Sequence, residues 1–235
     1  MQARDYLILA STVTSFILTI VSLAAGHKHD AAENVAILTF PARAAPATRP
    51  GLVIDGATDW LVSLHYLSIC IRHTGNMTSF EGPHTTCDRR PGGYTFHPDD
   101  PFIRQTVNGA VVLPATLEPL HTVAPFTTLV LAVVFVGAGS LLLLYSALPI
   151  PIFWTIRPRI HLGLLLLAAT MMAISAISIS VIIGHHEHGE IKRTRSFLGI
   201  IWSAVGLIYV ALILKAYDML KQWQRVRALR DDSDR

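Results

Sequence analysis

Charged residues are absent from four long stretches of this 235-residue sequence. No Asp, Glu, Lys or Arg occurs in Tyr6–Gly26, Leu120–Ile156, Ile160–His186 or Ser196–Leu214. Each stretch is about as long as the roughly 17–25 apolar residues that cross a bilayer. Charged residues make up only 15% of the chain and its mean hydropathy is +0.47, which excludes an ordinary soluble domain. Four buried helices in a soluble core are the alternative, but such helices normally carry a polar face.

The charge-free stretches predict a mainly α-helical membrane protein with four spans, near residues 6–26, 124–148, 161–184 and 197–215. Residues 27–122 form a long outer loop, and residues 216–235 form a short tail. Lys215–Arg230 is predicted to continue as a basic helix, which either lies on an anionic leaflet or ends in solvent. The first span could instead be a cleaved signal peptide, since Arg4 precedes it and Ser22–Ala25 offers a cleavage site. Its apolar run is longer than the roughly 7–15 residues of a signal peptide, which favours an uncleaved span.

Basic residues predict which side of the membrane each segment faces. Four spans place both termini on one side, and that side holds nine Lys or Arg residues and five Asp residues. Short segments with excess Lys and Arg face the cytoplasm, so both termini are predicted there. Lys192, Arg193 and Arg195 in the short second outer loop oppose this assignment. The cysteine pair and glycosylation sequon of the long loop require the outer side and decide it.

The long loop contains both cysteines of the chain, Cys70 and Cys87. A single pair in a translocated loop predicts a disulfide, and closing a loop of this length contributes roughly 3 kcal/mol in the chain-entropy model. Two free thiols, or a metal site with His73 and His84, are the alternatives. Asn76 lies between the cysteines in an Asn-Met-Thr sequon, so it is a predicted glycosylation site on an exposed tip.

Apolar alternation predicts a small antiparallel sheet in the same loop. The run from Trp60 to Ile71 alternates and predicts one strand that ends at Cys70. The Ala/Pro stretch at residues 41–50 offers little to bury and predicts an exposed connector. Tyr94–Phe96 is predicted to pair back onto this region, and the prolines that follow end that strand because proline donates no ladder hydrogen bond. Two further strand candidates are short: Val35–Phe40 and Leu52–Ile54.

Histidines concentrate on the predicted outer side. His185, His186 and His188 surround Glu187, but the HHEH run lacks the i, i+4 spacing of the helical zinc protease motif. We therefore expect a solvated polar turn, with opportunistic metal binding as the alternative, and neither a catalytic site nor a cofactor. Acidification would add positive charge to this face, so a pH sensor is a further hypothesis. The ten outer histidines are His27, His29, His65, His73, His84, His97, His121, His185, His186 and His188.

Several loop residues follow the pattern YLSIC…C…GYTFHP. The pattern resembles that of the fungal PalI/Sur family of claudin-like, four-span plasma-membrane proteins, in which an aromatic-plus-cysteine element precedes a second cysteine and an aromatic-Phe-x-Pro segment. The stretch Ala36–Phe40 also fits that family. The resemblance implies a left-handed four-helix bundle with a small antiparallel sheet in the first outer loop. The residues that carry it are Tyr66, Cys70, Cys87, Gly93, Tyr94, Phe96 and Pro98.

The resemblance also implies a role. It predicts a non-enzymatic organiser of cortical membrane domains such as eisosomes, acting in cell-wall integrity, endocytosis or ambient-pH signalling. The implied partners are the bilayer, further copies of the chain or other membrane proteins, and cell-wall or cortical scaffold components. No nucleic-acid partner is expected, because no basic patch carries interleaved aromatics. The spans as drawn hold no Asp, Glu, Lys or Arg, which counts against a transporter, although a calcium-influx-related tetraspan stays an alternative.

Overall fold

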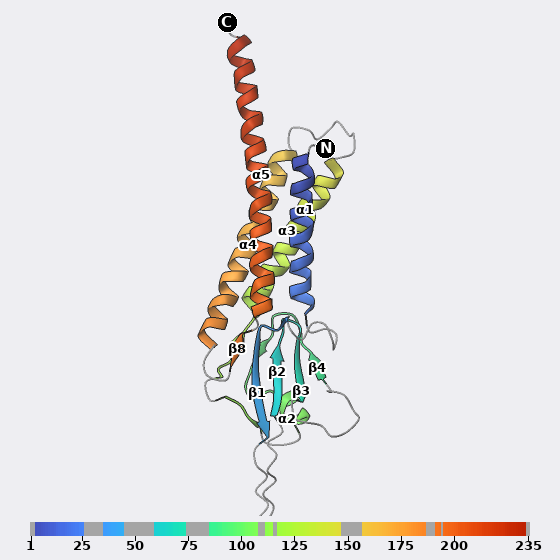
Figure 1. The fold of residues 1–235 in the computed structure, drawn as a ribbon, viewed down its shortest axis with the longest axis vertical. Coiled ribbons are helices and arrows are strands. Elements are labelled where there is room, and N and C mark those ends of the chain that lie inside the picture. The colour runs from blue at the N-terminus through green and yellow to red at the C-terminus, as the bar shows by residue number, and fades with distance from the viewer. Residues whose placement is uncertain are drawn as a thin grey trace, which may run out of the picture. The chain divides into compact units, whose positions relative to one another are not determined.

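The described part of the chain forms two compact units in the computed structural model of the protein (Figure 1). The helix unit consists of Met1–Ile20, Thr128–Ile174 and Ile200–Arg235, and the sheet unit of Val21–Thr127 and Ser175–Gly199. Four long helices contribute residues to both units. The structure describes residues 3–25, 35–44, 59–73, 85–107, 111–114, 117–146, 157–186, 191–193 and 195–233.

Each of the four long helices overlaps one of the charge-free stretches, and the last helix continues past its stretch into the charged tail. They are α1 (Ala3–Ala24), α3 (Val123–Ser146), α4 (Arg157–His186) and α5 (Arg195–Ser233). Each contains a window long and apolar enough to cross a membrane. Large apolar side chains such as Val134, Leu141 and Val181 are exposed along them, as expected of surfaces that lipid covers. The prediction of a mainly helical, four-span membrane protein is confirmed.

Two hydroxyls of α1 inside the helix unit donate to backbone carbonyls. The hydroxyl of Ser15 on α1 donates to the Ala204 carbonyl of α5 at 2.9 Å, and that of Thr19 donates to the Ser15 carbonyl within α1. One of these bonds joins two helices and the other satisfies a hydroxyl within its own helix. At one end of the unit, the Arg4 guanidinium of α1 pairs with Asp218 of α5 at 2.7 Å.

The sheet unit is built on four antiparallel strands in the order β4-β3-β2-β1 (Figure 1). Side chains at matching register positions form its buried face, and Phe40, Val62 and Ile71 make one such row across three strands. Burial of these apolar rows fixes the register, because a one-residue slip would turn each row to the opposite face. The strands are β1 (Leu38–Ala44), β2 (Asp59–Leu64), β3 (Ser68–His73) and β4 (Thr85–Arg89).

Shorter elements complete the sheet unit. Two short strands, β6 (Val111–Val112) and β8 (Lys192–Arg193), pair with opposite ends of β1. A separate two-stranded ladder joins β5 (Thr95–Phe96) to β7 (Leu120–His121). The one-turn-and-a-half helix α2 (Pro101–Thr106) lies between β5 and β6 in the sequence.

Three strand predictions need correction. The run from Trp60 to Ile71 is two antiparallel strands, because the chain reverses at residues 65–67 and the apolar turn residue Tyr66 is buried. The predicted connector after Phe40 is wrong over residues 41–44, which continue β1. The predicted strand at Tyr94–Phe96 is present as β5 (Thr95–Phe96), but it pairs forward with β7 and not back onto the preceding strands. The candidate Leu52–Ile54 lies outside the described residues.

Candidate recognition site around the disulfide

The disulfide joins two strands at a single register position. Cys70 on β3 is the direct partner of Cys87 on β4, with 4.0 Å between their Cα atoms, so the predicted disulfide is confirmed. Among the described strands, β4 pairs only with β3 and forms one edge of the sheet. Five register pairs join β4 to β3, and no second strand among those described lies on its other side. The covalent bond therefore adds to the attachment of an edge strand.

Tyr66 anchors the turn between β2 and β3. Its side chain is fully buried, and its ring packs against Phe126 and Phe197 at centroid distances of 5.8 and 5.7 Å. Burial raises the pKa of the Tyr66 hydroxyl above its ordinary value, and the neighbouring Ser175 hydroxyl offsets part of the rise. Tyr66 thus stabilises the turn between β2 and β3 through aromatic packing.

Tyr94 ties the segment after Cys87 to the start of β3. Its hydroxyl donates to the Ser68 carbonyl at 3.3 Å, while its own carbonyl accepts from the Thr122 hydroxyl at 2.7 Å. Burial raises the pKa of the Tyr94 hydroxyl, with a lowering contribution from Arg90 and a raising one from Asp100. The turn before it needs glycine, since Gly93 has a φ of 72°.

Phe96 and Pro98 complete the aromatic-Phe-x-Pro segment. The ring of Phe96 is fully buried and lies 5.7 Å from that of Phe40 on β1, centroid to centroid. Pro98 is half-buried in the turn that leads to α2. The residues that carry the family resemblance are therefore structural members of the sheet unit.

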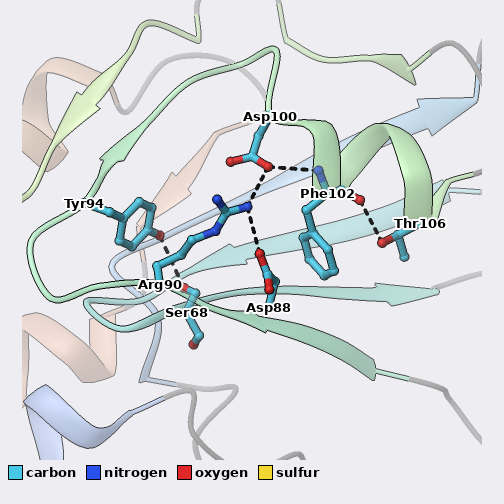
Figure 2. Close-up of polar contacts among 7 residues, drawn as sticks. All are labelled: Ser68, Asp88, Arg90, Tyr94, Asp100, Phe102 and Thr106. Atoms are coloured by element: carbon cyan, nitrogen blue, oxygen red, sulfur yellow. Dashed lines mark hydrogen bonds and ion pairs between the residues drawn. The ribbon is translucent and has the colours of Figure 1, made fainter.

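A network of charged side chains connects the end of β4 to the start of α2 (Figure 2). The guanidinium of Arg90 contacts Asp100 at 2.7 Å and Asp88 at 2.9 Å, and Asp100 also accepts from the Phe102 backbone N–H at 3.0 Å. The side chain of Asp100 is only 8% exposed, so this carboxylate both caps α2 and holds a partly buried cation. The backbone N–H of Arg90 donates to the Leu67 carbonyl, which fixes the network to the β2–β3 turn.

The sequence signal for this network is an aspartate followed by proline. Asp100 is an N-cap residue and Pro101 occupies the first helical position, which is the usual start of a helix. Read only as a strand-ending proline cluster, this segment gives no hint of α2. The pairing of Arg90 with Asp100 depends on the turn between them and carries no spacing signal of its own.

The histidine candidates do not gather into a metal site in the described residues. His185 and His186 lie in the last turn of α4, with ring centroids 5.3 Å apart. The Nδ1 atom of His186 donates to the Ile182 carbonyl, and Nε2 of His185 lies 3.6 Å from a carboxylate oxygen of Glu118. His188, His84 and the glycosylation candidate Asn76 lie outside the described residues. His73 lies at the end of β3, and the two cysteines of the alternative metal site are bonded to each other.

The exposed positions next to the disulfide form the candidate recognition site. Thr86 and Arg89 on β4 are exposed, whereas Cys87 and Asp88 between them are half-buried. We call Thr86, Arg89 and the outer edge of β4 the stapled edge. Polar side chains on an ordered strand suit protein recognition, because the backbone supplies hydrogen bonds and alternate side chains supply specificity.

The sequence matches no protein-family model and no curated protein. Fold and site together define the class: a four-span integral membrane protein with a disulfide-bonded antiparallel sheet in the loop after its first helix.

Proposed function

We propose that the protein is a non-enzymatic organiser of plasma-membrane domains, and that the stapled edge binds its partners. The four helices hold the chain in the bilayer with both termini in the cytoplasm, so the sheet faces outward. The proposed partners are further copies of the chain, other membrane proteins, or components of the cell wall or cortical scaffold. Cell-wall integrity and endocytosis are the processes that such a role would serve.

The observation that carries the proposal is the covalent attachment of the edge strand at one register position. An edge strand presents backbone groups to which another strand can add. A disulfide at that edge keeps it ordered before binding, and pre-ordering lowers the entropic cost of association. Natural proteins usually shield such edges, and here Arg89 provides a charge that would reject unmatched strands.

Imaging of a fluorescently tagged copy in living cells tests the proposal. We expect patches at the cell cortex that Arg89→Glu disperses, because it reverses a charge on the stapled edge. Arg104→Glu is the matched control: Arg104 is also exposed, but it lies on α2 and contacts Asp99. Retained patches in the Arg104 variant and lost patches in the Arg89 variant support the proposal. A uniform or internal-membrane pattern for the parent protein contradicts it.

A pH-sensing role is the second candidate, on the observation that His185 lies beside Glu118. A protonated His185 would attract that carboxylate and draw the end of α4 towards residues 117–119. Both side chains are about 70% exposed, so this attraction is weak, of the order of 0.2–1 kcal/mol. Patch formation that changes between about pH 5 and 8 in the parent but not in His185→Gln would support this role. Patches that ignore pH would exclude it.

A further inference from the structure

His161 is an ionisable side chain inside a membrane span. It lies on α4, two residues after the first residue of the span Arg159–His186, and it is only 2% exposed. Neither ring nitrogen has a hydrogen-bond partner within the described part of the chain. A buried donor or acceptor without a partner is costly, and ionisable residues within spans usually serve a function.

A second unpartnered polar group lies on the neighbouring helix. The hydroxyl of Ser140 on α3 is buried and has no hydrogen-bond partner among the described residues. Next to it, Gly139 faces the imidazole, since a Cβ on Gly139 would lie 3.8 Å from Cδ2 and 3.9 Å from Nε2 of His161. The glycine therefore lets the imidazole approach the backbone of α3, one residue before Ser140.

The charge at this place is positive. Lys215 on α5 lies close enough to His161 for their charges to interact, and it is half-buried. Lys215 forms no ion pair within the described chain, and the carboxylate of Asp218 is already paired with Arg4. Arg159, on the same helix as His161, is exposed and adds another cation. Three hydrogen-bond donors, one each from α3, α4 and α5, thus have no protein acceptor among the described residues.

We propose that Ser140, His161 and Lys215 bind the phosphate of an anionic membrane phospholipid. A phosphate supplies acceptors for the hydroxyl, the imidazole N–H and the ammonium group, and it balances their charge. His161 lies about 3 Å along the helix axis from the first residue of the span, which is the depth of lipid headgroups. Both ring nitrogens of His161 are buried in this structure. Binding of the headgroup therefore requires the imidazole to rotate away from Gly139. The site does not depend on the proposed role of the sheet.

Lipid binding to the purified full-length protein tests the proposal. The protein is placed in phosphatidylcholine nanodiscs with and without phosphatidylglycerol, and bound lipid is counted by native mass spectrometry. We expect Lys215→Gln and His161→Leu each to weaken phosphatidylglycerol binding about tenfold, the loss of one charge-assisted hydrogen bond. Lys221→Gln is the matched control, because it removes the same charge from an exposed position of α5 and should change binding by less than about twofold.

Thermal unfolding separates loss of the site from loss of the fold. In phosphatidylcholine alone, His161→Leu should unfold at the same temperature as the parent or higher, because it removes two unpartnered nitrogens. With phosphatidylglycerol, the parent should gain stability and the variant should not. Equal losses of binding in the Lys215 and Lys221 variants, or unchanged binding in His161→Leu, overturn the proposal. If inorganic phosphate raises the unfolding temperature of the parent as much as phosphatidylglycerol does, the site binds a free anion, and the proposal of a lipid ligand is overturned.

Discussion

Cys70 on β3 lies directly opposite Cys87 on β4, and the two sulfur atoms are bonded. The bond closes a loop between residues 17 apart in the sequence and fastens the edge strand to its only described neighbour. In the chain-entropy model, the double variant Cys70→Ser, Cys87→Ser loses about 3 kcal/mol of stability in the sheet unit. Hydrogen exchange should show β4 amides losing protection before those of β1 and β2, which retain strand neighbours. Equal protection of β4 in parent and variant would contradict this account of the edge.

Asp99 and Asp100 are adjacent, but their carboxylates are expected to contribute differently to the free energy of unfolding. Asp100→Ala removes the cap of α2 and leaves Arg90 with only Asp88, so we expect a loss of about 2–4 kcal/mol in the free energy of unfolding. Asp99 is 87% exposed and contacts Arg104 at the surface, so Asp99→Ala should cost no more than about 1 kcal/mol. Thermal denaturation of the two variants gives the comparison. Equal losses would show that the Arg90 network contributes nothing beyond a surface pair.

Glycine is required in the turn before Tyr94. A Cβ at Gly93 would lie 2.9 Å from the Cα of Val123, and its φ of 72° disfavours any other residue. A Cβ at Gly92 would lie 2.1 Å from the ring of Phe126, which already packs against Tyr66. We expect either alanine variant to lose about 1–3 kcal/mol, with Gly93→Ala the more severe because backbone cannot move aside.

Gly163 on α4 is the matched control for these glycines. A Cβ there meets nothing within 4 Å, so Gly163→Ala should keep or raise stability by about 0.5 kcal/mol through helix propensity. Melting temperatures in one detergent compare all three variants. A loss at Gly163 as large as that at Gly93 would mean that the substitutions act through something other than the turn.

Alkaline pH should weaken the sheet unit. Burial raises the pKa of Tyr66 and Tyr94 above the ordinary value near 10, so the unfolded chain releases these protons at lower pH than the folded chain. Their contribution to stability is complete below about pH 10 and falls as the pH rises above it. Tyr66→Phe and Tyr94→Phe should each flatten the fall in melting temperature above pH 10. Tyr6→Phe, at an exposed position of α1, should leave the fall as in the parent.

The helices could be predicted from the sequence and the strand pairings only in part. A membrane span is a local property, since a charge-free stretch of sufficient length must satisfy its own backbone hydrogen bonds as a helix. The disulfide was also predictable, because only one pairing of two cysteines exists. The reversal at residues 65–67 was not, because Tyr66 is buried against Phe126 and Phe197, which lie far away in the sequence. The turn therefore carries the apolar pattern of a strand.

Pro41 shows a second limit of local patterns. It belongs to β1 and pairs with Leu61 of β2, although the Ala/Pro stretch around it predicts a connector. Proline is tolerated at a strand edge, and among the described residues β8 and β6 pair with β1 only on either side of this position. The same holds for His161, since a lone histidine near the end of a span gives no sign of which groups will surround it. Such features depend on partners that only the folded chain brings together.

Fluorescence recovery after photobleaching of a tagged copy at the cell cortex tests the central claim most directly. If a disulfide-bonded outer sheet holds the protein in membrane domains, the parent recovers slowly within cortical patches. The Cys70→Ser, Cys87→Ser variant, which keeps all four spans, recovers as fast as a freely diffusing membrane protein. Slow recovery that is unchanged in the variant, or fast recovery of the parent, would contradict the claim.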